Sequence, residues 1–135
     1  MKTIDIKGKP YITVNERLKY FREHDAYAGW KLTTEIVFFN KGELVLLPSP
    51  DKDGNLYRWK PADIMIKASI IDDKDNLIAT AHSYEKENSS VVNQTSFVEN
   101  SETSAWGRVL GNIGIGIDTS VASAEEVINA IKNQK

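Results

Sequence analysis

The stretch Ile64-Met65-Ile66-Lys67-Ala68-Ser69-Ile70 decides the fold of this 135-residue chain. Isoleucine or alanine occupies every second position, and a period of two places those side chains on one face of a β-strand. The turn-forming sequence Asp73-Lys74-Asp75-Asn76 comes next and leads into a second run, Leu77 to Lys86. In that run Ala79, Ala81 and Ser83 face one way, and Thr80, His82, Tyr84 and Lys86 face the other. The two runs predict an antiparallel hairpin with one buried face.

Further strands are predicted upstream of this hairpin. Lys31 to Phe39 is rich in Thr, Ile, Val and Phe, which suit a pleated sheet. Asn40-Lys41-Gly42 indicates a tight turn before another short run, Glu43 to Leu47. The cluster of breakers from Pro48 to Asn55 indicates an exposed loop. We therefore expect a three- to four-stranded antiparallel meander.

Helices are predicted both before and after the strands in the sequence. Thr13 and Glu16 form a capping box for an N-terminal helix from Val14 to His24. Its apolar stripe is Val14, Leu18 and Phe21, so Arg17, Lys19 and Arg22 are expected on the remaining surface. Near the C-terminus, Ser123 and Glu126 form the capping box of a short last helix.

A long helix is predicted from Ser96 to Ile113, and its surface is unusually rich in small residues: Ser101, Ser104, Ala105, Gly107 and Gly111. Small side chains allow a helix to lie close to a sheet. A glycine inside a helix costs about 1 kcal/mol, so both glycines need a packing reason. With strands grouped together and helices at the ends, the chain is predicted to be a single α+β domain over residues 1–135.

Composition excludes several classes of protein and site. The chain has no cysteine, which excludes disulfides and zinc-thiolate sites. Its two histidines lie in different elements, and no nucleophile motif is present, so we expect no enzyme, no catalytic residue, no metal and no cofactor. No apolar run approaches the roughly 20 residues of a membrane span. A soluble cytoplasmic protein, in a bacterial host cell, is expected.

Two glycine motifs favour plain structural explanations. Asp51-Lys52-Asp53-Gly54-Asn55 does not have the spacing of an EF-hand calcium loop and is predicted to be an Asp-Gly turn. The run Gly111 to Gly116 ends a helix rather than opening one. A helix C-terminus repels phosphate, so this run is predicted to be a helix stop.

Charge is unevenly distributed although the net charge is only −2. Residues 1–67 hold 12 Lys/Arg and 9 Asp/Glu, a balance of +3, whereas residues 68–135 hold 5 and 10, a balance of −5. A local basic region that attracts phosphate is compatible with this distribution.

The strongest local sign of ligand binding is Tyr57-Arg58-Trp59-Lys60, and Trp30-Lys31 repeats the pairing of an aromatic with a cation. Bases of single-stranded nucleic acids stack on aromatic rings while cations hold the phosphates. The alternative is an edge strand with buried Tyr and Trp and solvated Arg and Lys. The sequence leaves both interpretations open.

One segment resembles a known family. Asn93 to Gly116, with Glu102-Thr103-Ser104-Ala105-Trp106-Gly107-Arg108-Val109-Leu110 at its centre, is similar to a helix of small single-strand annealing proteins from phages of Gram-positive bacteria. The resemblance extends to residues 11–17, 80–86 and 118–127. These phage proteins are in turn distantly similar to the ERF-type annealing superfamily.

The resemblance implies a sheet packed on a long helix, assembly into a homo-oligomeric ring or filament, and single-stranded DNA in a groove lined by hairpin and helix residues. It implies that Arg108 contacts the DNA backbone. Gly107 and Gly111 stand where the superfamily often has cations, which weakens the basic face. An ion pair of Arg108 with Glu99, Glu102 or another acid is the alternative.

The predicted function is therefore that of a phage protein that binds and anneals single-stranded DNA in recombination or replication. Its partners would be single-stranded DNA and further copies of itself, with no membrane. The predicted DNA-binding residues, expected to share one furrow, are Trp30, Lys31, Tyr57, Arg58, Trp59, Lys60, Lys67 and Arg108.

Two other functions remain open at this stage. An OB-fold protein that coats single strands would also use aromatics and a basic groove. A phage protein that binds a host protein or a small molecule is compatible with the acidic second half of the chain.

Overall fold

The computed structural model describes residues 1–88, 93–117 and 121–132. Its elements are, in chain order, β1 (Thr3–Ile6), β2 (Lys9–Ile12), α1 (Val14–Glu23), the 3₁₀ turn η1 (Asp25–Tyr27), β3 (Lys31–Asn40), β4 (Glu43–Leu46), β5 (Tyr57–Lys60), β6 (Asp63–Ile71), β7 (Leu77–Lys86), α2 (Asn93–Asn112) and α3 (Ala124–Lys132). The predicted α+β class is confirmed.

The chain begins with a β-hairpin, β1–β2, and the expectation that a helix comes first was wrong. Lys7 and Gly8 lie between the two strands with φ of 51° and 83°, and the Gly8 amide donates to Asp5 Oδ1 at 2.8 Å. Positive φ at both central residues is the geometry of a two-residue hairpin turn. Lys-Gly is a weaker turn signal than Asn-Gly, which explains why the pattern was missed.

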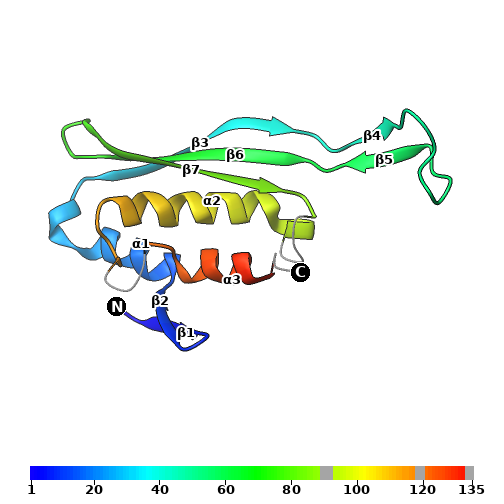
Figure 1. Ribbon diagram of the computed structural model, residues 1–135. Coiled ribbons are helices and arrows are strands. Elements are labelled where there is room, and N and C mark those ends of the chain that lie inside the picture. Colours follow the sequence, from blue (N-terminus) through cyan, green and yellow to red (C-terminus); the bar gives the residue numbers. More distant parts are fainter. Residues whose placement is uncertain (89–92, 118–120, 133–135) are drawn as a thin grey trace.

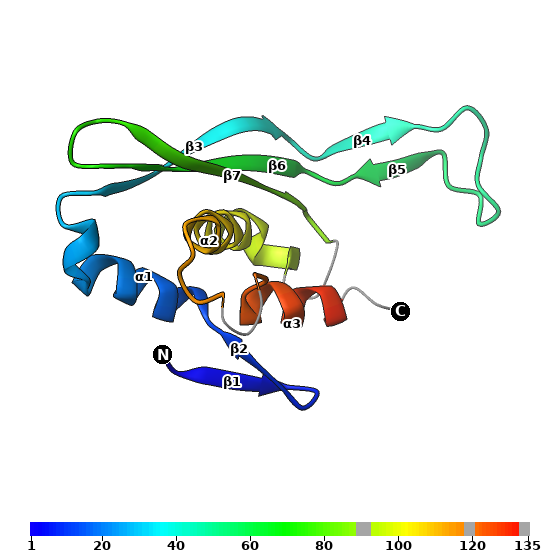
Figure 2. The same ribbon diagram turned by 60° about the vertical axis from the view of Figure 1, so that its left-hand side comes forward.

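The central sheet has the strand order β3-β6-β7, with all neighbours antiparallel. Residues alternate between buried and half-buried along the whole of β6. Ile64, Ile66, Ala68 and Ile70 are the buried ones and form the core with Ala105, Val109 and Leu110 of α2. All three helices lie on this side of the sheet (Figures 1 and 2). Because β3 and β7 are both edges, the sheet does not close, and the barrel alternative does not apply.

Strands β4 and β5 form a two-stranded hairpin that prolongs β3 and β6 beyond the helices (Figures 1 and 2). We call residues 41–60 the arm. Its tip is the predicted loop, held by Asp51, whose Oδ1 accepts from the amides of Asp53 and Asn55 at 2.9 and 2.8 Å. These bonds, chiefly the one from Asn55, lower the pKa of Asp51. The predicted Asp-Gly turn is thus confirmed.

Helix α2 lies close to the sheet, as its small residues predicted. Ser101 is buried, and its hydroxyl lies 2.7 Å from that of Ser83 on β7. Ala105 is fully buried under the sheet. The helix begins earlier than predicted and is interrupted at Ser96, whose φ of −129° and ψ of 24° are not helical.

Arg17 is fully buried, which corrects the expectation that it lies on the surface of α1. Its Nη1 donates to the carbonyl of Gly107 at 2.7 Å, and its Nη2 donates to those of Gly116 and Val121 at 3.3 and 2.9 Å. Burial lowers the pKa of the guanidinium, while the carboxylates of Glu126 and Glu125 act in the opposite direction. An arginine keeps its charge even so, and this charge ties α1 to the end of α2.

The two glycines of α2 face α1 rather than the sheet. A Cβ at Gly107 would lie 2.8 Å from Val14 Cγ2, and one at Gly111 would lie 2.9 Å from Arg17 Nη1. The helix then stops at Gly114, with φ of 94°. The Ile115 amide donates to Leu110 O and the Gly114 amide to Gly111 O, which is a Schellman motif. The predicted helix stop is confirmed.

The last helix is capped as its sequence predicted. In the first helix Thr13 accepts as predicted, but the Glu16 carboxylate accepts from the Lys2 amide at 3.4 Å rather than completing a capping box. Thr13 Oγ1 accepts from the Glu16 amide at 3.1 Å, and Ser123 and Glu126 bond reciprocally. The Val14 amide donates to both carboxylate oxygens of Glu125 at 3.0 Å. A carboxylate at a helix N-terminus is stabilising, so Glu125 of α3 stabilises the N-terminus of α1.

A Gly107→Ala substitution is expected to lower the free energy of unfolding by about 1–3 kcal/mol, the usual cost of overpacking a core. Val14 is buried and β-branched, so it cannot move aside easily. In an unconstrained helix the same change would gain about 1 kcal/mol, so the sign of the effect is informative. Urea unfolding followed by circular dichroism measures it, with Glu99→Ala on the exposed side of α2 as control. A more stable Gly107→Ala variant would contradict this packing.

Candidate nucleic-acid interface

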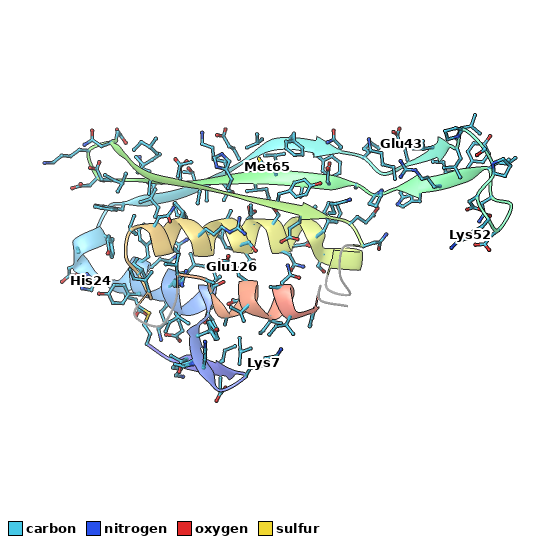
Figure 3. The ribbon with its side chains drawn as sticks, in the orientation of Figure 1. Lys7, His24, Glu43, Lys52, Met65 and Glu126 are labelled. Carbon is cyan, nitrogen blue, oxygen red and sulfur yellow. The ribbon has the colours of Figure 1, made fainter. Side chains whose placement is uncertain are left out.

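None of the described helices covers the second face of the central sheet (Figures 1 and 2). We call it the open face. Strand alternation and register assign to it Lys31, Thr33, Glu35 and Phe38 of β3, Asp63, Met65, Lys67 and Ser69 of β6, and Thr80, His82, Tyr84 and Lys86 of β7. Figure 3 labels Met65 on the central sheet.

Two aromatic rings lie together on the open face near the base of the arm. Phe38 and Tyr84 flank Met65 in register, and their ring centroids are 6.1 Å apart. Phe38 is 36% exposed and Tyr84 is 44% exposed. The sheet therefore presents two ring surfaces to solvent, side by side across its central strand.

A hydrogen-bonded group fixes the Tyr84 ring. The Tyr84 hydroxyl donates to Asp63 Oδ2 at 2.7 Å, and Asn40 Nδ2 donates to Asp63 Oδ1 at 2.8 Å. These donors, Tyr84 first, lower the pKa of Asp63, and the positive charges of Lys60 and Lys86 contribute to the same effect. The bond to the carboxylate raises the pKa of Tyr84 to about 12.

Cations surround these rings. Lys67 lies on the middle of β6, one third exposed, with its Nζ 3.2 Å from Glu35. Lys60 and Lys86 are close enough to Asp63 to lower its pKa. The open face carries three lysines and two acids, and the three helices together carry five cations and six glutamates. The layers thus differ little in net charge, and phosphate is favoured on the open face by the local group of lysines around the rings.

The arm separates the aromatic and cationic residues of Tyr57-Arg58-Trp59-Lys60. In register, Leu44 faces Trp59 and Leu46 faces Tyr57, while Val45 faces Arg58 and Glu43 faces Lys60. Successive residues of a strand point to opposite faces, so the rings lie on one face of the arm and the cations on the other. Tyr57 and Trp59 are 55% and 49% exposed, which excludes the alternative of buried rings.

Trp30 and Lys31 lie at the other end of β3 from the arm. Trp30 is half-buried and packs against the core, in edge contact with Tyr27 at 5.1 Å between centroids. Lys31 is exposed, and its Nζ is 3.2 Å from Asp75 in the turn between β6 and β7. Trp30 thus contributes to packing, and Lys31 lies at the rim of the open face.

Arg108 lies on the helical side, beside the outer edge of β7. Its Nη1 donates to the carbonyl of His82 at 2.7 Å, and its Nε is 3.2 Å from Glu126. The side chain is 47% exposed. The alternative of an intramolecular partner therefore holds, with Glu126 as the acid. A phosphate at Arg108 would have to compete with this carboxylate.

The predicted residues do not converge on one furrow. Arg108 contacts His82, which pairs with Lys67 on β6. Lys67 lies about 20 Å from Lys60 along the extended chain, so Arg108 is far from the arm. Trp30 and Lys31 lie further still from the arm. Three of them, Lys31, Lys60 and Lys67, lie on or beside the same surface, the open face and the base of the arm, and Lys31 lies at its far rim. The furrow predicted from sequence is absent from the part of the chain that the structure describes.

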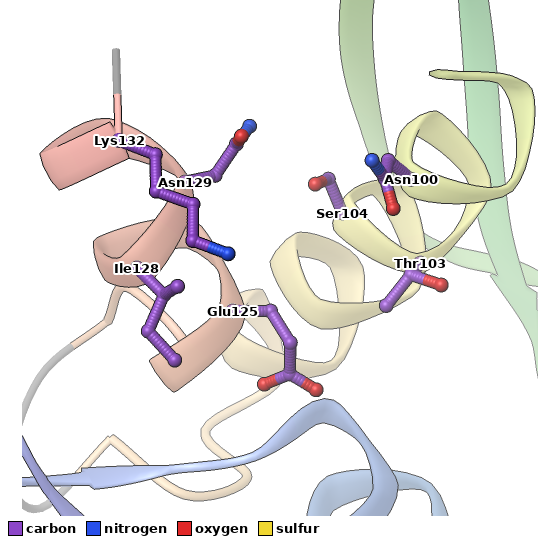
Figure 4. Close-up of a pocket in the computed structure, with 7 residues that line it drawn as sticks. All are labelled: Asn100, Thr103, Ser104, Glu125, Ile128, Asn129 and Lys132. Carbon is purple, nitrogen blue, oxygen red and sulfur yellow. The ribbon is translucent and has the colours of Figure 1, made fainter. Parts of the chain in front are cut away.

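Hollows on the helical side are small or shallow. A cleft of about 230 Å³ lies between α2 and α3 and is lined by Asn100, Thr103, Ser104, Glu125, Ile128, Asn129 and Lys132 (Figure 4). This is below the roughly 300–1,000 Å³ of a small-molecule site, and Glu125 already caps α1. Two broader hollows of about 430 and 400 Å³ share Arg108, Ala122 and Glu126 in their linings.

Sequence reasoning missed Phe38, Tyr84 and Lys86 as candidate ligand contacts. Alternation along β7 did group Tyr84 and Lys86 on one face. It could not indicate that this face stays uncovered, or that Phe38 joins it after a bulge at Val37. Within the described residues no cluster of His, Asp and Glu could hold a metal ion. Among the described helices, none is long and apolar enough to cross a membrane.

Residues 53–113 match the model of a family described as Slr1353 N-terminal dsRNA-binding domain-like. The matched segment contains β5, β6, β7 and α2. It therefore includes two of the three strands of the open face, and the chain is similar to this family over that part. No curated protein and no solved structure matches the chain. The resemblance to phage annealing proteins stays a prediction.

A Tyr84→Phe variant is expected to raise the pKa of Asp63 toward its ordinary value, because the carboxylate loses its main donor. A carboxylate whose pKa is lowered by folding stabilises the fold above its ordinary pKa of about 4 and loses that contribution as pH falls through the lowered value. In the variant this contribution should be smaller, and its loss should be complete at a higher pH. Carbon-13 NMR titration of the carboxyl groups measures the change, with Asp51 as internal control. An unmoved Asp63 titration would show that the bond from Tyr84 does not form in solution.

Proposed function

We propose that this protein binds nucleic acid, specifically single-stranded DNA, on the open face of its sheet and the base of its arm. The observation that carries the proposal is the pair of exposed rings, Phe38 and Tyr84, flanked by Lys60, Lys67 and Lys86 on an otherwise uncovered sheet. The similarity to a dsRNA-binding domain-like family supports the broader statement, that the ligand is a nucleic acid.

Single strands suit this surface better than duplexes because their bases are accessible for stacking. Base–aromatic stacking contributes about 1–3 kcal/mol per base and does not depend on sequence. A duplex keeps its bases stacked inside and offers mainly phosphates and sugars. Rings fixed on a rigid sheet, as the bond from Tyr84 to Asp63 fixes one of them, lose little conformational entropy on binding.

Strand annealing in phage recombination or replication is the finer form of the proposal, and it follows from the resemblance of residues 93–116. An annealing protein brings two bound strands together, so it should accelerate pairing of complementary oligonucleotides. A protein that only coats DNA should slow that pairing. Following the pairing rate with labelled oligonucleotides at increasing protein concentration decides between the two.

Replacing Tyr84 by Leu should weaken binding to an oligonucleotide by about tenfold, the equivalent of stacking one base on one ring. Tyr84→Phe should keep most of the affinity, because the ring remains although its bond to Asp63 is lost. Tyr57→Leu, an exposed ring on the apolar face of the arm, is the matched control and should change little. Fluorescence anisotropy with a labelled oligonucleotide measures all three. Equal losses for Tyr84→Leu and Tyr57→Leu would remove the open face from the proposal.

The double variant Arg58→Ala/Lys60→Ala should bind more weakly and with a shallower salt dependence. For a single strand, the slope of log affinity against log salt becomes shallower by about 0.7 for each phosphate that the protein no longer neutralises. Lys9→Ala/Lys19→Ala is the control, since both lysines are exposed and lie on β2 and α1, away from the arm. An unchanged slope in the Arg58/Lys60 variant would exclude these residues from the site.

Double-stranded RNA is a second candidate ligand, favoured by the description of the matched family. A duplex of about 16 base pairs, the length that a double-stranded-RNA-binding domain spans, is a suitable probe in the same titrations. If the duplex is the ligand, salt dependence should be steep while Tyr84→Leu has no effect. Tighter binding of the duplex than of single-stranded DNA would favour this second function.

A further inference from the structure

The arm and the edge of β3 expose an unusual amount of apolar surface. Six large side chains of this region are between 48% and 68% exposed: Ile36, Val37, Phe39, Leu44, Leu46 and Trp59. At about half of roughly 200 Å² each, they present on the order of 600 Å². Exposed apolar patches of this size on a single chain mark interaction sites.

The two edges of the central sheet differ in how they are protected. On β7, the carbonyl of His82 accepts from Arg108 Nη1 and that of Thr80 accepts from Asn112 Nδ2, so side chains of α2 occupy this edge. On the other side, β3 pairs only with β6 and β4 only with β5 among the described strands. The outer edge that runs from β3 into β4 is therefore available for pairing with another strand.

We infer that two copies of this chain associate through the β3–β4 edge, antiparallel about a two-fold axis near Val37. A surface that pairs with its own copy must be self-complementary, and this edge meets that condition. Because the bulge at Val37 inverts the alternation of faces, an axis between Val37 and Phe38 is the one that keeps residues of the same face opposite each other. It places Ile36 of one copy opposite Phe39 of the other, and Glu35 opposite Asn40. This register does not set like charges against each other.

The apolar surface supports the same partner. Strand pairing across the edge adds backbone area to the roughly 600 Å² of apolar side chains, which approaches the about 800 Å² that each partner buries in a stable interface. Ile36 and Phe39 lie on the helical face of β3. Phe39 stacks on Phe97 of α2, with 6.4 Å between ring centroids, yet Ile36 and Phe39 remain 60% and 48% exposed, and a second copy would cover that exposed surface. The bulge at Val37 interrupts the edge, so pairing takes place on both sides of it.

A closed dimer follows from the difference between the two edges. A ring or filament of sheets needs two different complementary edges, one on each side of every subunit. Since α2 obstructs β7 at Thr80 and His82, the central sheet can pair only through its β3 edge, and pairing of central sheets stops at two copies. This inference does not depend on nucleic-acid binding, and the open faces of both copies would stay accessible.

Sedimentation equilibrium of the full chain tests the inference. Twice the mass of one chain is expected for the wild type, and Val37→Lys should raise the dimer dissociation constant at least tenfold by setting two ammonium groups together at the axis. Ile78→Lys is the matched control: Ile78 is also a β-branched residue at an edge-strand bulge, 44% exposed against 48% for Val37, but lies on β7. It should remain dimeric. A monomeric wild type, a larger assembly, or equal weakening by both variants would overturn the inference.

A second measurement covers the case in which Val37→Lys fails to fold, which circular dichroism would reveal. The chain has no cysteine, so Val37→Cys introduces a single thiol near the proposed axis. Mild oxidation should convert it to a covalent dimer much faster than Ile78→Cys. Similar rates for the two thiols would contradict the interface. Binding of an oligonucleotide by a monomeric Val37→Lys variant would leave the proposed function intact, so the two proposals can fail separately.

Discussion

The buried guanidinium of Arg17 is the interaction on which the arrangement of the helices depends. Removing a charge from water is costly, and hydrogen bonds from Arg17 to the carbonyls of Gly107, Gly116 and Val121 offset that cost. Those three carbonyls lie in α2, in the glycine turn after it, and before α3. One side chain of α1 therefore determines where the rest of the helical layer lies. Gly107 and Gly111 are required because a side chain there would occupy the space of Val14 or Arg17.

This helical layer leaves one face of the sheet to solvent, and that asymmetry determines the candidate function. All four glutamates of α2 and α3 lie in the helical layer, and one of them, Glu126, neutralises Arg108. The lysines of β6 and β7 lie across the sheet from them. A phosphate is thus attracted to the lysines of the open face, although the net charge of the chain is −2. Net charge alone gives a poor guide to such a protein.

Local rules predicted most of the fold. Alternation located β6 and β7, serine and threonine caps located α1 and α3, and a glycine run located the end of α2. Arg17 shows where such rules end: on a helix it shares a face with Val14 and Phe21, but its type argues for the surface. Only the tertiary contact with three carbonyls explains its burial. The uncovered sheet face was unpredictable for the same reason, since alternation groups side chains without indicating which group the helices cover.

The candidate site illustrates a further limit of reading neighbours in sequence as neighbours in space. The rings and cations of Tyr57-Arg58-Trp59-Lys60 could share one surface only if the segment were a loop. In a strand, each ring and the cation next to it in sequence point to opposite faces. The rings and cations that share a surface come instead from different strands, as Phe38 and Tyr84 do across Met65. Residues in register across the three strands, such as Phe38, Met65 and Tyr84, form a row perpendicular to the strands. Lys67 lies in a neighbouring row, nearer the middle of the sheet. A single-stranded ligand that contacted the rings and then Lys67 would therefore run parallel to the strands and away from the arm.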